Sequence, residues 1–289
     1  MSNPLHAAHY ADGAKQHAVQ VVERHDLAHE TYLVRIACPD MAARIRPGQF
    51  LMVRQPNSAE PLLGRAFAMY DVHVNESGAP TFVDIVFHIV GKMTQVLSEV
   101  RPGDELTVWG PLGNGFEPRE TDHLIMVAGG IGQTPFLALA KEYLGAANFG
   151  RTVSTASKVT LCYGARSQKY LAGVEDFQTL GVDVNVSTDD GSSGHHGLVT
   201  DVLNKLLLTV DDNERVRVVC CGPEKMMVSV SELCSEKKVS CQVSLETPMA
   251  CGIGICFSCV TPVRQKDGNW DFKRTCVDGP VFESTDLAW

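Results

Sequence analysis

Residues 251–259 read CGIGICFSC, and one more cysteine follows in the segment RTC at 274–276. The resulting spacing, Cys-x4-Cys-x2-Cys-x16-Cys, matches the plant-type [2Fe–2S] pattern with its distal fourth ligand. Gly252 and Gly254 tolerate positive φ and carry no side chain, so this loop can wrap tightly and bring the thiolates together. The predicted ligands are Cys251, Cys256, Cys259 and Cys276. Zinc is the alternative, but zinc prefers two separated and closely spaced pairs, so the spacing favours an iron–sulfur cluster.

The segment that holds these cysteines, residues 241–289, is short, rich in glycine and cysteine, and irregular in its hydrophobic pattern. It is too small to form an apolar core of its own. We therefore expect a small C-terminal [2Fe–2S] domain, in which the bound cluster supplies the stability that apolar burial does not. The other six cysteines are expected to be small buried apolar residues.

The bulk composition limits the remaining classes of function. Of 289 residues, 44% are hydrophobic and 20% are charged, which suits two or three globular domains. The formal net charge of −9 and the absence of a basic run argue against nucleic-acid binding. No apolar stretch reaches the roughly 18 residues of a membrane span. Residues 1–17 lack a signal-peptide pattern and are expected to be a flexible lead-in to a cytoplasmic protein.

Upstream of the cluster segment, residues 117–240 alternate between strand and helix patterns. HLIMVAGG at 123–130 is a buried apolar strand that ends in glycines, and TPFLALAKEYLG at 134–145 has helical spacing. The strands continue in KVTLCYGAR, VDVNVSTDD and RVRVVCCGP, and LVTDVLNKLLL is a further helix. This alternation predicts a parallel-sheet, nucleotide-binding α/β domain with helices on both faces of the sheet.

The glycines between the first of these strands and its helix are candidate dinucleotide ligands. Gly129, Gly130 and Gly132 would let a pyrophosphate approach the backbone at a helix N-terminus, although a plain tight turn is the alternative. The loop STDDGSSG at 187–194 offers no arginine pair for a 2′-phosphate. The sequence therefore favours NAD over NADP.

Residues 18–116 form a series of short strand patterns separated by the turn signals RPGQ, NESGAP and RPGD. The strand patterns are HAVQVVERH, TYLVRIAC, QFLMVRQ, RAFAMYDV, FVDIVFHIV and DELTVWG. Such strands without long helical runs predict a small antiparallel β-barrel, with one helix at Thr94–Val100. The predicted fold class is thus a multi-domain β plus α/β protein.

Part of this barrel resembles the ferredoxin–NADP reductase superfamily. The strand residues Arg65, Ala66, Phe67 and Ala68 are similar to its Arg-x-aromatic-Ser/Thr/Ala motif. The resemblance implies that the arginine binds the FAD pyrophosphate, for which a guanidinium fork is suited, and that the strand backbone binds the isoalloxazine. The segment VFHIVGKMTQVL resembles the element that lines the flavin and then opens a helix under the pyrophosphate. On that resemblance the flavin contacts are Val86, Phe87 and His88, and the phosphate-turn residues are Met93 and Thr94.

The turn in VVCCGPEKMM resembles the element of the same superfamily that lies beside the nicotinamide. The resemblance implies that Cys221 lies near the site of hydride transfer and that Gly222 contacts the cofactor. It also implies that Asp189, Asp190 and Gly191, in the loop after the preceding strand, lie near the dinucleotide, with Asp190 as the predicted contact. A buried cysteine at the end of a strand is the alternative reading of Cys221.

The order of barrel, nucleotide domain and C-terminal cluster loop resembles the electron transfer subunit of type B dihydroorotate dehydrogenases. The closest agreement lies in LETPMACGIGICFSC and CVDGPVF. The resemblance implies FAD, a [2Fe–2S] cluster and NAD as cofactors. It also implies an FMN-containing, dihydroorotate-oxidising catalytic subunit as partner, in a heterotetramer that serves pyrimidine biosynthesis. Electrons would pass singly from that FMN through the cluster to FAD, and then as a hydride to NAD+.

Two other functions are open at this point. An electron-input subunit of another complex, or an NAD(P)H:ferredoxin or flavin oxidoreductase, shares the first two domains. A cluster-binding redox sensor is an alternative without enzymatic activity. The paired flavin and dinucleotide motifs argue against a sensor, because a sensor needs no path for a hydride.

Overall fold

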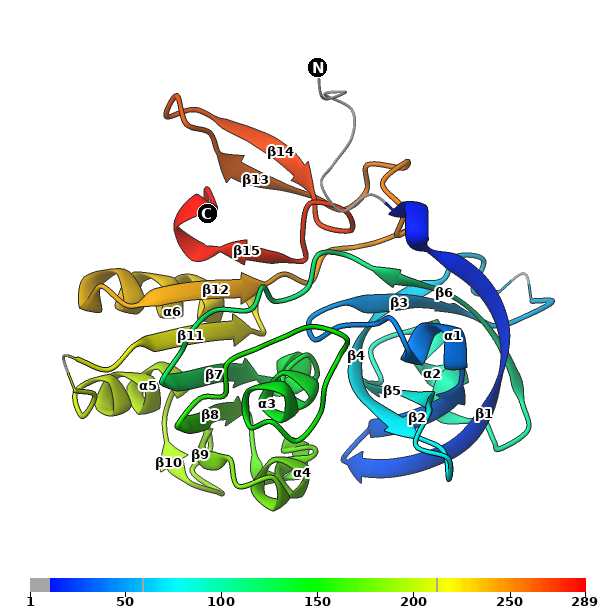
Figure 1. Ribbon diagram of the computed structural model, residues 1–289, viewed down its shortest axis with the longest axis horizontal. Helices are drawn as coiled ribbons and strands as arrows, with labels where there is room; N and C mark the ends of the chain where they lie inside the picture. The colour runs from blue at the N-terminus through cyan, green and yellow to red at the C-terminus, as the bar shows by residue number, and fades with distance from the viewer. Residues whose placement is uncertain (1–10, 59, 212) are drawn as a thin grey trace.

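A computed structural model describes residues 11–58, 60–211 and 213–289. It contains a closed six-stranded antiparallel barrel, a seven-stranded sheet with helices on both faces, and a two-stranded hairpin above the sheet (Figure 1). None of the helices among these residues is both long and apolar enough to cross a membrane. The predicted fold class is confirmed.

The barrel closes in the strand order β1-β2-β5-β4-β3-β6. Its strands are β1 (Lys15–Ala28), β2 (Thr31–Ala37), β3 (Phe50–Arg54), β4 (Arg65–Val74), β5 (Pro80–His88) and β6 (Glu105–Leu112). All six predicted strand patterns are strands, and the predicted helix at 94–100 is α2 (Lys92–Ser98). The short helix α1 (Pro39–Ala42) follows β2. Of the expected lead-in, residues 15–17 already belong to β1, and residues 1–10 lie outside the described residues.

The second sheet has the order β10-β9-β8-β7-β11-β12-β15. Its strands are β7 (His123–Gly129), β8 (Lys158–Ala165), β9 (Asp183–Thr188), β10 (His195–His196), β11 (Val216–Cys221), β12 (Ser240–Ser244) and β15 (Val281–Glu283). The helices are α3 (Leu137–Tyr143), α4 (Val174–Thr179), α5 (Val199–Leu207) and α6 (Glu224–Lys237). Every residue of β7 is buried, because α3 and α4 cover one face of the sheet while α5 and α6 cover the other.

The boundary expected at residue 241 falls within a strand of the sheet. Residues 240–244 form β12 and pair in parallel with β11, and β15 pairs antiparallel with β12. The sheet therefore takes strands from both ends of the segment that we assigned to the cluster domain. That segment is also more regular than expected, since it contains the hairpin of β13 (Val260–Arg264) and β14 (Trp270–Arg274).

The C-terminal segment is also attached to the barrel through Asn114. The side-chain amide of Asn114 donates to the Val281 carbonyl at 2.7 Å and accepts from the Val281 N–H at 3.1 Å. Its backbone N–H donates to the Gly279 carbonyl at 2.7 Å. A Cβ on Gly113 would lie 2.5 Å from Pro280, so these two segments of the chain are in direct contact. Barrel, sheet and cluster segment thus meet at the end of β6.

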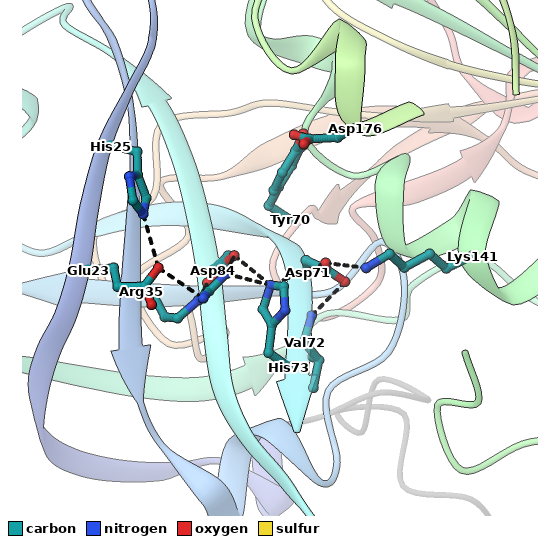
Figure 2. Close-up of polar contacts among 10 residues, drawn as sticks. All are labelled: Glu23, His25, Arg35, Tyr70, Asp71, Val72, His73, Asp84, Lys141 and Asp176. Carbon is teal, nitrogen blue, oxygen red and sulfur yellow. Dashed lines mark hydrogen bonds and ion pairs between the residues drawn. The ribbon is translucent and has the colours of Figure 1, made fainter. Parts of the chain in front are cut away.

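A second contact joins the barrel to the nucleotide domain, through neighbouring residues of β4 (Figure 2). The Tyr70 hydroxyl donates to Asp176 of α4 at 2.5 Å, and Asp71 forms an ion pair with Lys141 near the C-terminal end of α3. Both β4 residues are buried. Strand β4 thus has two roles: it begins with the flavin motif, and its residues Tyr70 and Asp71 hold the two domains together.

The same strand leads into an ionic network on the outer face of the barrel wall, where Asp84 is buried (Figure 2). Asp84 of β5 accepts two hydrogen bonds from Arg35, at 2.8 and 2.9 Å, and one from His73 at 2.8 Å. Burial disfavours the charged form of Asp84, but the hydrogen bonds from Arg35 and His73 outweigh burial and lower its pKa. The ionised carboxylate is therefore the form that the fold stabilises.

This depressed pKa predicts how stability depends on pH. The network contributes its full stability above the ordinary aspartate pKa of about 4, and that contribution is lost as the pH falls through the lower, folded-state pKa. Below about pH 4, the free energy of unfolding of the wild type should fall more steeply than that of Asp84→Asn, which cannot titrate there. Urea denaturation at a series of pH values measures both slopes. Equal slopes would contradict the prediction.

Candidate cofactor sites

The four predicted ligand cysteines lie in two neighbouring parts of the chain. Cys251, Cys256 and Cys259 occupy the loop between β12 and β13, and Cys276 follows β14. The Thr275 N–H donates to the Cys259 carbonyl at 2.8 Å, which ties the two parts together. Cys259 and Cys276 are buried, Cys251 is half-buried and Cys256 is exposed, and all four are free thiols.

The thiols approach one another as two pairs. Cys256 interacts with Cys251, and Cys259 interacts with Cys276. Among the described residues, no three or more His, Cys, Asp or Glu side chains are grouped as one metal ion would require. A single zinc needs four ligands around one point, whereas a [2Fe–2S] cluster spreads its four thiolates over two irons. The preference for a two-iron cluster over zinc rests on the Cys-x4-Cys-x2-Cys-x16-Cys spacing.

Two of these thiols are readily ionised. A hydrogen bond with Ser258 lowers the pKa of Cys256 to about 6, and a hydrogen bond with Cys276 lowers the pKa of Cys259 to about 6. The pKa of Cys276 is raised in turn by its hydrogen bond with Cys259. The thiolate is the form that binds metal, so each pair already contains one cysteine suited to be a ligand.

The loop backbone has the conformation that the glycines predicted. Gly252 and Gly254 have φ values of +72° and +83°, in the region that favours glycine. Between them, the Ile253 N–H donates to the Cys251 sulfur at 3.4 Å. The Arg274 guanidinium donates to the Gly254 carbonyl at 2.9 Å, so strand β14 holds the loop closed.

At the start of β4, the Arg65 side chain is exposed. Its guanidinium donates to the carbonyls of Leu63 and Gly64, at 3.2 and 3.0 Å, and it forms no ion pair with a described residue. A guanidinium fork without a carboxylate partner can accept a diphosphate. Of the residues that follow, Ala66 and Ala68 have small side chains, which leave room for a flavin beside the strand.

The other flavin candidates divide into two groups. The side chains of Phe67, Val86, Phe87 and Met93 are buried in the protein core, so they can contact a flavin chiefly through their backbone. The Thr94 hydroxyl accepts hydrogen bonds from the N–H groups of Val90 and Gly91, at 2.9 and 3.1 Å, and so caps the start of α2. His88 is half-buried and is the one of these candidates that lines the large cavity described next.

A cavity of about 990 Å³ lies along the carboxyl ends of the sheet strands, which is where parallel sheets bind nucleotides. Gly129, Gly130, Gly132 and Gly222 line it, as predicted for a dinucleotide turn. A Cβ on Gly132 would lie 2.2 Å from the Cys221 carbonyl oxygen, and one on Gly222 would lie 3.0 Å from the Gly129 nitrogen. Three of the glycines thus allow the two turns to pack together, whereas Gly130 faces open space.

The acidic residue on the cavity is Asp189 rather than its neighbour Asp190. The Asp190 carboxylate accepts hydrogen bonds from the Ser192 N–H and hydroxyl, and those bonds lower its pKa. Asp190 therefore stabilises its own turn. Asp189 and Arg166 both line the cavity, at the ends of β9 and β8.

Cys221 lies at the end of β11, between the two glycine turns. Burial, together with the negative charge of Glu246, raises the pKa of its thiol to about 12. The thiol is therefore protonated at neutral pH and is not a nucleophile. Glu246 and Gly222 line the cavity, whereas Cys221 itself is not among the residues that line it.

Three family models match successive parts of the chain. The model described as an oxidoreductase FAD-binding domain matches residues 18–116, and that of an oxidoreductase NAD-binding domain matches residues 126–232. The iron–sulfur cluster binding domain of dihydroorotate dehydrogenase B matches residues 246–288. The chain thus carries domains for FAD, NAD and an iron–sulfur cluster.

Full-length relatives agree with the domain matches. The dihydroorotate dehydrogenase B (NAD(+)) electron transfer subunit of Desulforamulus reducens is 33% identical over 264 residues, which cover 91% of this chain and 94% of the relative. The chain belongs to the family of dihydroorotate dehydrogenase B electron transfer subunits. The member from Clostridium perfringens is 37% identical over 248 residues, covering 86% of this chain and 89% of its own.

This electron transfer subunit is also similar in structure to other reductases whose structures have been solved. The structure of an NADH-dependent reduced ferredoxin-NADP oxidoreductase is 28% identical, with a TM-score of 0.78, and covers 94% of this chain and 90% of its own. A ferredoxin reductase of carbazole 1,9a-dioxygenase, 22% identical, has a TM-score of 0.63 over 78% of this chain and 67% of its own. The second likeness concerns the fold alone.

Sequence reasoning did not identify several residues of the electron transfer subunit that line its cavity. Besides Arg166 and Glu246, the lining includes Thr261 of β13 and Trp289. The C-terminal segment is held there by β13, since the Ala288 N–H donates to the Pro262 carbonyl at 3.1 Å. The folding of the chain brings these residues to the cavity from separate parts of the sequence, so no local motif signals them.

The flavin assignment leads to a direct test of Arg65. Arg65→Ala should weaken FAD binding by about 1.5–3 kcal/mol, because it removes a charge-assisted hydrogen bond to the pyrophosphate. Fluorescence titration of the apoprotein with FAD measures the change. Arg101→Ala, at an exposed turn before β6, removes an equivalent charge and should leave FAD affinity unchanged. Wild-type affinity in Arg65→Ala would exclude the pyrophosphate assignment.

Proposed function

We propose that this chain transfers electrons between NAD+ and a separate FMN-containing subunit that oxidises dihydroorotate, as a step of pyrimidine biosynthesis. The observation that carries the proposal is the set of four cysteines in the C-terminal segment, of which Cys259 and Cys276 pack against the same barrel that bears the flavin motif. FAD, when bound, exchanges single electrons with the cluster and a hydride with the nicotinamide. The chain's own residues hold and orient these groups.

Each part of the protein has one task in this proposal. Arg65 and the β4 backbone hold the FAD, and the glycine turn at 129–132 admits the dinucleotide to the cavity. Glu246 lines the wall beside Gly222, and the neutral thiol of Cys221, just before Gly222, offers no reactive thiolate. Cys256, the exposed ligand, marks the side from which a partner can approach the cluster.

We further propose that the functional complex is a heterotetramer in the cytoplasm. The relatives are named as electron transfer subunits, which implies a catalytic partner. Co-purification of the native chain with its partner, followed by mass measurement of the complex, tests the stoichiometry. Assay of dihydroorotate-dependent NAD+ reduction by that complex tests the function, and a pure complex without this activity would refute it.

A second candidate is favoured by the likeness to the ferredoxin-NADP oxidoreductase structure. In that case the chain would exchange electrons with ferredoxin instead of a dihydroorotate-oxidising subunit. The purified chain alone distinguishes the two: NADH-driven reduction of ferredoxin without a catalytic partner would favour the second candidate. Elemental analysis of the same sample should find about two irons per chain in either case, whereas zinc without iron would refute both.

A further inference from the structure

Trp109 of β6 is the residue through which the barrel holds the cluster loop. Its indole N–H donates to the carbonyl oxygen of Cys251 at 2.9 Å. The two residues are far apart in sequence, so this bond forms only when the cluster segment folds back onto the barrel. Cys251 is one of the four predicted cluster ligands, and the bond therefore fixes the backbone of a ligand.

Strand register places Trp109 in one row with the flavin motif. Trp109 lies opposite Met52 of β3, and Met52 lies opposite Ala66 of β4. Directly opposite residues of antiparallel strands project from the same face, so the three side chains form a row on the outer wall of the barrel. They belong to one apolar cluster with Cys259 and Cys276.

Two glycines show how closely these parts fit. A Cβ on Gly252 would lie 2.7 Å from Met52 Cγ and 3.0 Å from Leu112 Cδ1, so the loop backbone rests directly on the barrel wall. A Cβ on Gly64 would lie 2.6 Å from the Trp109 ring. The indole is therefore packed between the backbone that precedes Arg65 and the backbone of Cys251.

We propose that Trp109 is a positioning residue for the iron–sulfur cluster, which fixes ligand Cys251 against the strands that carry the flavin motif. The proposal rests on the proposed function, since it requires a cluster at the four cysteines. A residue that orients a metal ligand from outside changes metal affinity or activity about 10–100-fold when it is replaced. A residue that only filled space would act through its ring and not through its N–H group.

Trp109→Phe separates these roles, because it keeps an aromatic ring over Gly64 and Met52 but removes the N–H donor. Iron release from the FAD- and iron-loaded full chain to a ferrous chelator is expected to be about tenfold faster than in the wild type. FAD content and the rate of FAD reduction by NADH should be unchanged. Trp270→Phe is the matched control, since Trp270 is exposed on β14, and it should release iron at the wild-type rate.

A second measurement does not need the cluster. In the iron-free full chain, amide hydrogen exchange of residues 250–259 should be faster in Trp109→Phe than in the wild type, while exchange in β1–β5 is the same in both. Wild-type iron release or wild-type loop protection in Trp109→Phe would overturn the proposal. A wild-type chain that binds no iron would instead refute the cluster assignment, and so the proposed function itself.

Discussion

Replacing Cys259 with serine is expected to stop dihydroorotate-driven NAD+ reduction by the assembled complex while sparing NADH-driven reduction of ferricyanide by the chain. Hydride transfer from NADH requires the dinucleotide cavity and the flavin, and Cys259 belongs to neither. The partner's electrons require the cluster, and Cys259 is one of its two buried ligands. Steady-state assays of both reactions, on one preparation, measure the separation.

Loss of the cluster also loosens the C-terminal segment, because metal binding contributes to its folding. FAD content and the thermal transition of the barrel and sheet therefore have to be measured on the same variant. Cys38→Ala removes a buried thiol from the barrel core, outside the cluster segment, and should retain both activities. The hypothesis fails if the cluster-free complex with bound FAD still reduces NAD+ from dihydroorotate. It also fails if ferricyanide reduction is lost while FAD stays bound.

Arg35→Ala is expected to lower the free energy of unfolding by about 3–5 kcal/mol, because it leaves a buried carboxylate without its principal partner. Asp84 is almost fully buried, and Arg35 supplies two of its hydrogen bonds. His73 remains as a partner but is already shared with Asp71. Urea denaturation at neutral pH measures the loss.

The matched control is Glu23→Gln, which removes the exposed member of the same network. Glu23 accepts from Arg35 at 3.0 Å, but its side chain is 41% exposed. Ion pairs with such exposure contribute about 0–1 kcal/mol, so this variant should remain close to the wild type. A loss in Arg35→Ala as small as that in Glu23→Gln would show that Asp84 is solvated in the folded protein.

The barrel and the core of the nucleotide domain could be predicted because their signals are local. Alternating strands between turn residues, and the buried run of β7 before its glycines, are visible in short windows. Strand β15 has no such signal, since it is three residues long and pairs with β12 across the whole cluster segment. Its place in the sheet is decided by long-range pairing, which a local pattern does not contain.

The candidate site residues likewise divide into those with a local signal in the sequence and those whose place depends on long-range contacts. All four cysteines could be predicted as ligands because their spacing within one segment reflects the chemistry of a cluster. Both Asp189 and Asp190 were predicted near the dinucleotide, with Asp190 as the contact, because sequence alone does not show which of two adjacent residues in a turn faces the cavity. Glu246 and Trp109 could not be found, because their roles depend on contacts with Cys221 and Cys251 that exist only in the folded chain.

The pairing of β12 with β15 makes the cluster segment an insertion whose two ends meet at the edge of the sheet. Ser244 and Val281 are directly opposite each other, and the Leu245 N–H donates to the Pro280 carbonyl, so residues 245–280 leave and rejoin the sheet edge at one point. In topological terms they are the enlarged loop of a β-hairpin. Insertions whose two ends meet are well tolerated, and a different redox loop could be grafted here without rerouting the rest of the chain. A short turn in the same place, with polar residues at Met52 and Leu112, would convert the protein into a plain two-electron flavin reductase.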